Sequence, residues 1–269
     1  MPNRDSLGAA MRPDLYVFYV LDTSGSMQNK PIGVLNRAMD ETVDALRQMA
    51  ALNSDANVKI AVLEFNSTCR WIQPRGPEDL EDFFWQDLSA AGKTEVGAAL
   101  KELDSKLSRN GFLNSMTSAF LPVIIFMTDG YATDNYESEL AKALQNKWFA
   151  KATRVGFAIG RNPDVEMIAK LVGSSEAVIR TEDLGVFARL LRFVSVSAST
   201  LAGNSHTRDM EVNGAEAVSR GLAAAGISRD SVSADIDYRE QPYRDAPVRP
   251  VGGGVQSDGT VLWDDSAVF

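Results

Sequence analysis

Four short apolar segments, separated by stretches with a helical pattern, constrain the fold of this chain more than any other feature. They are residues 15–21, 58–65, 121–127 and 155–159. Each is rich in β-branched and aromatic residues, as expected for strands of a parallel sheet that is covered on both faces. Between them, apolar residues recur every three or four positions, as in helices with one buried face. Alternating strands and helices predict a doubly wound α/β fold.

The same periodicity places the remaining elements. Two further short strands are expected at residues 69–72, at an edge of the sheet, and at residues 177–179. The sheet would then have about six strands, mostly parallel and flanked by helices. Asp134 and Glu137 resemble a capping arrangement at the start of one of these helices. The predicted helices cover residues 31–49, 96–107, 136–149, 164–172 and 183–199.

The composition divides the chain into a domain and a tail. With 269 residues and 45% hydrophobic content, the chain can build one substantial α/β core. After about residue 204, lysine is absent, acidic residues outnumber arginines, and Pro and Gly accumulate. We therefore expect a domain over residues 13–203 and an acidic, poorly structured tail over residues 204–269. The apolar last residues, 260–269, suit a docking peptide for a partner, a disordered terminus or a terminus that packs back on its own domain.

Charge and cysteine content exclude several classes of function. The formal net charge of -9 argues against nonspecific binding to nucleic acid or to an anionic membrane. A single cysteine, Cys69, and a single histidine, His206, exclude a disulfide framework and a Cys/His zinc site. The N-terminal residues do not resemble a signal peptide, and the apolar run after them is too short to span a bilayer. We therefore expect a cytoplasmic protein.

Five oxygen-bearing side chains lie at the ends of predicted elements. Asp22, Ser24 and Ser26 follow the first strand, Thr94 precedes a helix, and Asp129 follows the strand at 121–127. In open α/β sheets, ligands bind beyond the carboxyl ends of the strands. Carboxylates and hydroxyls suit Mg²⁺, with Ca²⁺ or Mn²⁺ as alternatives. Two carboxylates and three hydroxyls could hold such an ion without filling its coordination sphere.

These segments, in this order, resemble the von Willebrand factor A domain and its metal-ion-dependent adhesion site, whose pattern is Asp-x-Ser-x-Ser, a distant Thr and a distant Asp. The resemblance implies that Ser24, Ser26 and Thr94 offer hydroxyls to the metal. It also implies that Asp22 and Asp129 bind the metal directly or through water. The segments LDTSGSM, PIGVLNRAMDETVDAL, FMTDGYATDN and RFVSVSAST are similar to the TerY-like bacterial branch, which is linked to tellurite resistance.

The resemblance also implies a function. Such a domain is a non-enzymatic module whose metal accepts an Asp or Glu from a partner protein, and ligand binding is implied to shift the last helix, residues 183–199. Protein kinases, phosphatases, and components of stress response or phage defence are the implied partners. Lys93 stands where the family usually has a small residue. A cation there would either weaken metal binding or attract an acidic partner.

Enzymatic alternatives fit the residues less well. Gly92-Lys93-Thr94 resembles the end of a phosphate-binding loop, but the glycine required five residues earlier is Asp87. An aspartyl phosphatase needs a second acid two residues after Asp22, where Ser24 stands. A metal-dependent phosphatase or nucleotide hydrolase stays as the enzymatic alternative. Self-assembly through the tail is the structural alternative.

Other conspicuous residues have both a structural and a functional interpretation. Asp134 would be a helix cap, which we favour, or part of an outer ring around the metal. Cys69 would be a half-buried strand residue rather than an activated thiol. His206 would be an exposed tail residue. An aromatic cluster near the edge strand would be mainly core, or a partner surface where its members are exposed. Its members are Trp71, Phe83, Phe84 and Trp85.

Overall fold

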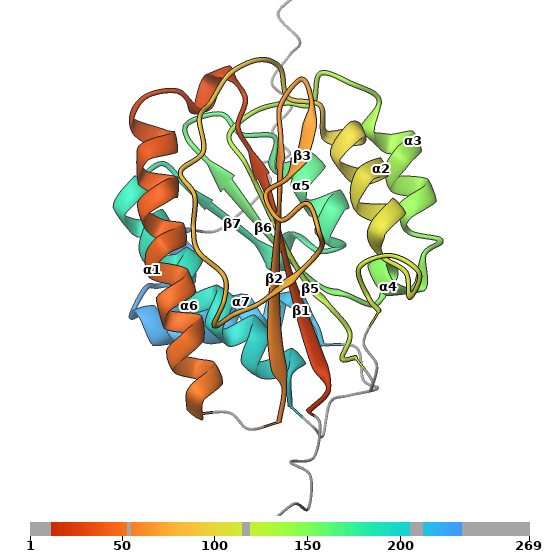
Figure 1. Cartoon of the computed structure of the whole chain (residues 1–269). Helices are drawn as coiled ribbons and strands as arrows, with labels where there is room; N and C mark the ends of the chain where they lie inside the picture. The colour runs from red at the N-terminus through yellow and green to blue at the C-terminus, as the bar shows by residue number, and fades with distance from the viewer. Residues whose placement is uncertain (1–11, 53–54, 115–118, 205–211, 233–269) are drawn as a thin grey trace, which may run out of the picture. The chain divides into compact units, whose positions relative to one another are not determined.

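A central sheet with helices on both faces forms the folded unit (Figure 1). The computed structural model describes residues 12–52, 55–114, 119–204 and 212–232. The strands are β1 (Asp14–Asp22), β2 (Asn57–Phe65), β3 (Cys69–Trp71), β4 (Glu78–Asp79), β5 (Val123–Thr128), β6 (Thr153–Ile159) and β7 (Val178–Thr181). The helices are α1 (Lys30–Leu52), α2 (Val96–Lys106), α3 (Tyr136–Ala143), α4 (Lys147–Ala150), α5 (Val165–Val172), α6 (Leu184–Ala202) and α7 (Gly214–Ala225).

The sheet is mostly parallel. Its strand order is β3-β2-β1-β5-β6-β7, and β4 pairs with another part of β2. The β1–β2, β1–β5, β5–β6 and β6–β7 pairs are parallel, whereas β3 and β4 run antiparallel to β2. The predicted fold class is therefore confirmed, including the short edge strand that begins at Cys69.

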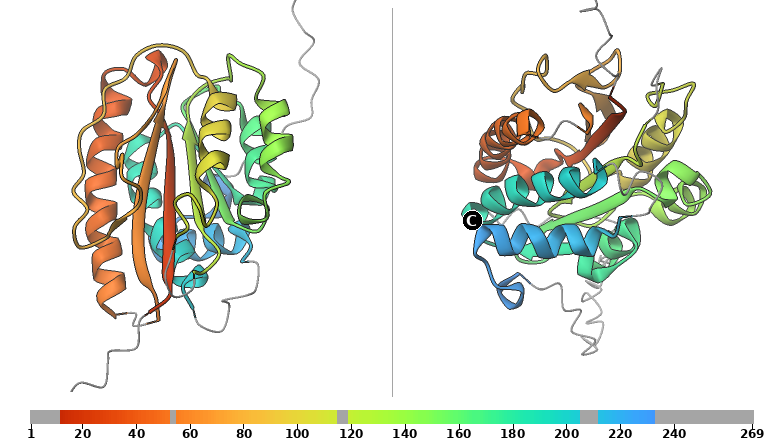
Figure 2. Two further views of the ribbon diagram at one scale, coloured as in Figure 1. Left: turned by 45° about the vertical axis from the view of Figure 1, so that its right-hand side comes forward. Right: turned by 90° about the horizontal axis from the view of Figure 1, so that it is seen from below.

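Two helical layers bury the sheet. Helices α1, α6 and α7 cover one face, and α2, α3, α4 and α5 cover the other (Figures 1 and 2). Along β1, Val17 and Tyr19 point to the first layer, whereas Tyr16 and Phe18 point to the second. Since both faces of β1 are covered, its apolar run is unbroken.

The helix expected over residues 136–149 is instead two helices, α3 and α4. The chain turns between them, and the side chain of Asn146 accepts a hydrogen bond from the backbone N–H of Trp148 to cap α4. The Asn146 amide also donates to Asp104 Oδ1, at 2.8 Å, and to the carbonyl of Leu107. The helix is therefore interrupted where an asparagine finds partners at the C-terminal end of α2.

Helix α7 extends the folded unit beyond the boundary expected after residue 203. Its residues Val218 and Leu222 are buried in the core that α6 also lines. Gly221 lies so close to α6 that a Cβ there would meet Val194 Cγ2 at 2.5 Å. A Cβ on Gly214 would meet the carbonyl oxygen of Arg154 in β6 at 1.9 Å. The domain boundary expected after residue 203 is therefore too early, because glycines let a helix with few large side chains pack closely. Residues 205–211 and 233–269 of the expected tail lie outside the described residues.

Helix α6 is the one described helix that is long and apolar enough to cross a membrane by length and composition alone. In this fold it packs between α1 and α7, and Leu190, Leu191 and Val194 are fully buried. Burial on several sides accounts for its apolar composition.

Candidate metal centre

The site lies where the strand order reverses. β1 has β2 on one side and β5 on the other, so the chain winds in opposite directions from this point. Leu21 pairs with Met127, which places the carboxyl ends of β1 and β5 side by side. Asp22 ends β1, and Asp129 directly follows β5. Their proximity thus follows from strand register, at the position where open α/β sheets bind ligands.

The loop after β1 arranges three of the expected residues. Asp22 is fully buried, and its Oδ1 accepts a hydrogen bond from the backbone N–H of Ser24 at 2.7 Å. The hydroxyls of Ser24 and Ser26 are 3.0 Å apart. The Ser26 hydroxyl donates to Asp129 Oδ1 at 2.6 Å. These contacts bring Asp22, Ser24, Ser26 and Asp129 together.

Thr94 reaches the same place from the loop before α2. A Cβ placed on Gly130 would lie 3.7 Å from the Thr94 hydroxyl oxygen and 3.8 Å from that of Ser26. The two loops are also joined through their backbones, because the N–H of Gly25 donates to the carbonyl of Gly92 at 2.9 Å. All five residues singled out by the sequence therefore surround one spot.

Burial sets the electrostatics of the two carboxyl groups. It raises the pKa of Asp22 above its ordinary value, hydrogen bonds from Thr128 and Ser24 oppose the rise, and the nearby charge of Asp129 adds to it. Burial likewise raises the pKa of Asp129, against the hydrogen bond from Ser26. Within the described ranges, no lysine or arginine pairs with either group. A divalent cation would neutralise this pair of negative charges.

The oxygen spacing suits a divalent ion. Neighbouring oxygen ligands of an ion bound at about 2.1–2.4 Å lie about 2.8–3.4 Å apart, depending on the coordination number. The Ser24–Ser26 and Ser26–Asp129 oxygen distances, 3.0 and 2.6 Å, are close to the lower end of this spacing. No cluster of three or more His, Cys, Asp or Glu side chains occurs among the described residues, so hydroxyls would have to share in holding an ion here.

Two neighbouring residues, Thr128 and Thr133, complete the site, and the sequence pattern assigned this role to neither of them. The Thr128 hydroxyl donates to Asp22 Oδ2 at 2.5 Å, in a buried position. Its only sequence signal is its place directly before Asp129. Thr133 donates twice to the carbonyl of Thr94, from its backbone N–H at 2.8 Å and its hydroxyl at 3.1 Å.

Asp134 caps a different helix from the one expected. Its Oδ1 accepts from the N–H of Gly97 at 3.0 Å and its Oδ2 from that of Ala98 at 2.9 Å, so it caps α2 rather than α3. Helix α3 is capped by Asn135, whose side chain accepts from Ser138. In the sequence, Asp134 stands just before α3, which suggests a cap for that helix. The sequence does not show that the fold brings the start of α2 to the Asp134 carboxylate.

The other residues considered lie apart from this chemistry. Lys93 is exposed, and its charge forms no ion pair with the two carboxylates of the site. Burial raises the pKa of the Cys69 thiol to about 11, so it is not an activated thiol. Phe83 is fully buried, as expected of a core residue, whereas Phe84 is 74% exposed. His206 lies outside the described residues.

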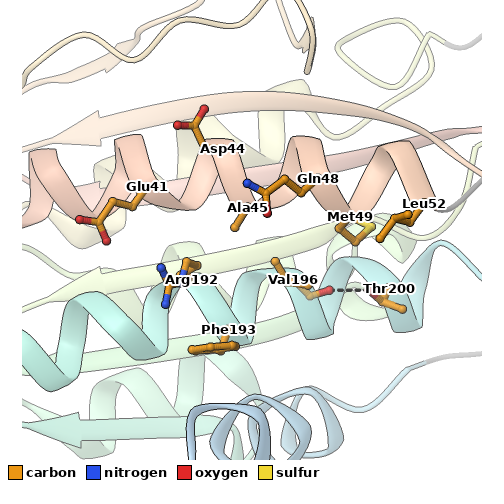
Figure 3. A pocket seen from close by; sticks show the side chains of 10 residues that line it. All are labelled: Glu41, Asp44, Ala45, Gln48, Met49, Leu52, Arg192, Phe193, Val196 and Thr200. Carbon is orange, nitrogen blue, oxygen red and sulfur yellow. Dashed lines mark hydrogen bonds between the residues drawn. The ribbon is translucent and has the colours of Figure 1, made fainter.

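A separate groove of about 790 Å³ runs between the C-terminal halves of α1 and α6 (Figure 3). Its walls are largely apolar, with Leu52, Met49 and Phe193 among them. The Asp44 carboxylate, which also lines the groove, pairs with Arg47 at 2.9 Å. The groove therefore brings together no set of polar groups comparable to that at the strand ends. Its lining residues are Glu41, Asp44, Ala45, Gln48, Met49, Leu52, Arg192, Phe193, Val196 and Thr200.

Comparison with known proteins agrees with this fold. Residues 17–132 match the von Willebrand factor type A domain family. No curated protein sequence matches the chain. Three solved structures illustrate the shared fold. They are proximal thread matrix protein 1 from the mussel byssus with a zinc-occupied MIDAS motif, a von Willebrand factor type A protein from Catenulispora acidiphila, and the pilus adhesin SpaC from Lactobacillus rhamnosus GG.

Their sequence identities to this chain are 17%, 19% and 12%, and their TM-scores are 0.52, 0.53 and 0.56. The matches cover 70%, 70% and 72% of this chain. They span only 48%, 43% and 31% of the other chains, so the likeness concerns one fold within longer proteins. The MIDAS motif of the mussel protein is described as occupied by zinc. Over residues 17–132 this chain is therefore similar in sequence to von Willebrand factor type A domains, and it shares the fold of the three solved structures.

Proposed function

We propose that the chain is a metal-dependent protein-binding module. Asp22, Ser24, Ser26, Thr94 and Asp129 would hold one divalent ion, which we take to be Mg²⁺. The observation that carries the proposal is the contact chain from Ser24 Oγ through Ser26 Oγ to Asp129 Oδ1, at 3.0 and 2.6 Å. These distances join ligands from two loops 103 residues apart in the sequence.

Charge counting supports binding of an acidic partner. Two carboxylates balance the charge of a divalent ion, and the three hydroxyls add none. When bound, the ion offers an open coordination position at which an Asp or Glu of another protein is attracted and not repelled. Ser24 in place of a second acid leaves the loop without a general acid for phosphoryl transfer, which supports a non-enzymatic role.

An exposed aromatic residue borders the site. Tyr131 follows Gly130, where a Cβ would lie 3.7 and 3.8 Å from the Thr94 and Ser26 hydroxyl oxygens, and it is 61% exposed. Exposed tyrosines often anchor protein interfaces, because they bury a large area at a small cost in side-chain entropy. We assign Tyr131 to the contact with the partner, next to the metal.

The cellular setting is part of the proposal. The segments LDTSGSM and FMTDGYATDN support a place in the TerY-like branch, in the cytoplasm, within a stress-response or phage-defence system. A protein kinase or phosphatase is the proposed kind of partner. Its acidic residue would bind the ion, and the domain would act by bringing proteins together.

Affinity capture from the native host tests the proposal. Wild-type protein in Mg²⁺ should retain a partner that is lost with chelator or in a Ser24→Ala/Ser26→Ala variant. A Ser228→Ala/Ser231→Ala variant, which removes two exposed serines elsewhere, is the matched control and should retain the partner. Tyr131→Ala should weaken capture without changing metal binding. A partner that stays bound in chelator and in the Ser24→Ala/Ser26→Ala variant would contradict the proposal.

A further inference from the structure

The loop between β5 and α3 joins both sides of the candidate site. Its first residue, Asp129, offers a carboxylate to the site. Further along this loop, Thr133 and Asp134 contact the segment that carries Thr94 and the start of α2. Helices α2 and α3 lie side by side in Figure 1, so this loop and the start of α2 meet at one end of the pair.

Helix α2 depends on this loop for its cap. Glu95 occupies the N-cap position of α2, but its side chain makes no capping hydrogen bond. The carboxylate of Asp134 accepts from the N–H groups of Gly97 and Ala98 instead, at 3.0 and 2.9 Å. The first turn of a helix has N–H groups without partners inside the helix, so this carboxylate takes the place of a local cap.

Thr133 holds the backbone carbonyl of Thr94 in place. The Thr94 carbonyl accepts hydrogen bonds from both the N–H and the hydroxyl of Thr133. On the other side, the N–H of Glu95 donates to the carbonyl of Asn66 at 3.2 Å. The Thr94 backbone is therefore held between two loops, and its side chain has little freedom to move away from the site.

A glycine permits this close approach. A Cβ on Gly97 would lie 2.9 Å from Asp134 Oδ2, 3.1 Å from the carbonyl oxygen of Asn135 and 3.1 Å from the Cα of Tyr136. Two of these three atoms belong to the backbone and could not yield by a rotamer change. The packing of α2 on this loop is therefore tight, independently of the hydrogen bonds.

We propose that Asp134, together with Thr133, is a positioning residue that sets the distance between the Thr94 hydroxyl and the Asp129 carboxylate, and so sets metal affinity. The proposal rests on the proposed function, since it concerns the same ion. The loop that supplies one ligand carries the groups that hold the other. Loss of the Asp134 carboxylate frees α2 and Thr94 to move relative to Asp129.

Mg²⁺ titration calorimetry on Asp134→Ala and a matched control tests this role. Asp183 is the control, because its Oδ1 accepts from Gly185 and Val186 at the start of α6, at 2.7 and 3.1 Å. Both variants remove a carboxylate that caps two N–H groups. Changes to residues that orient metal ligands lower metal affinity by about 10–100-fold, so we expect that loss in Asp134→Ala and a change of less than about twofold in Asp183→Ala.

Two milder variants keep the test decisive if Asp134→Ala does not fold. Asp134→Asn retains one acceptor oxygen and should recover part of the affinity. Thr133→Ala keeps the backbone hydrogen bond to Thr94 and should lose affinity several-fold. Wild-type affinity in these variants and in Asp134→Ala, with Mg²⁺ bound by the wild type, would overturn the positioning role while the proposed function stands. A wild-type protein that binds no Mg²⁺ would overturn both.

Discussion

Replacement of Gly221 by alanine tests whether α7 is packed into the domain as described. A Cβ at this position would lie 2.5 Å from Val194 Cγ2, 2.9 Å from its Cα and 3.0 Å from its backbone nitrogen. Because two of these atoms belong to the α6 backbone, a rotamer change cannot remove the clash. The two helices would have to separate.

The expected magnitude follows from two opposing terms. Overpacking of this kind costs about 1–3 kcal/mol. Alanine is favoured over glycine in a helix interior by about 1 kcal/mol. We therefore expect Gly221→Ala to lower the free energy of unfolding by up to about 2 kcal/mol.

Gly33→Ala in α1 is the matched control, because a Cβ there meets nothing within 4 Å. It should raise the free energy of unfolding by up to about 1 kcal/mol, so the two variants should differ by about 1–3 kcal/mol. In a domain of this size, each kcal/mol shifts the midpoint of thermal unfolding by about 2–4 °C. Urea and thermal unfolding of both variants measure the difference. Equal stability of the two variants would refute the close packing of α7 on α6.

Two further predictions concern the metal site. Thr128→Val leaves the buried Asp22 Oδ2 without its hydrogen-bond donor and should lower the free energy of unfolding by about 1–3 kcal/mol. It should also lower Mg²⁺ affinity, whereas Thr128→Ser keeps the hydroxyl and should not. Urea unfolding and Mg²⁺ titration that match the wild type would argue against this contact. Metal affinity should fall as the pH is lowered, and the fall should begin above the ordinary aspartate pKa of about 3.9. Burial raises the pKa of Asp22 and Asp129, so protons compete with the ion for these carboxylates at a higher pH. The stability of the metal-free protein should change in the other direction. Its folded state binds protons at Asp22 and Asp129 more tightly than the unfolded state does, so the contribution of these two groups to the free energy of unfolding rises as the pH falls through their raised pKa values. Thermal unfolding with and without Mg²⁺ across this pH range measures both effects, and a Mg²⁺-induced shift that stays constant on acidification would contradict the reasoning.

The sequence predicted the sheet because its strands are buried on both faces and therefore carry unbroken apolar runs. It also predicted which side chains meet beyond the strand ends, because parallel strands bring their carboxyl ends to one edge. The Thr128 contact with Asp22 depends on β1 lying directly beside β5, which local patterns do not specify. The Asp134 cap on α2 is a long-range contact of the same kind.

Helix α7 lies within the expected tail and nevertheless packs into the domain. Its segment is poor in large apolar residues, a composition typical of a tail. In the structure, Gly214 and Gly221 allow close approach to β6 and α6, so small side chains suffice for packing. Composition measures the apolar area that a segment can bury, but it does not measure how closely its backbone can approach a neighbour.

Titration of the metal-free protein with Mg²⁺ by isothermal calorimetry tests the central claim most directly. Wild type should bind one ion per domain. Asp129→Ala should lose this binding, because it removes one of the two carboxylates and the Ser26 contact at 2.6 Å. Asp164→Ala, which removes only the cap of α5, should bind the ion as wild type does. A wild-type protein without a saturable site, or an Asp129→Ala variant with wild-type affinity, would contradict the account.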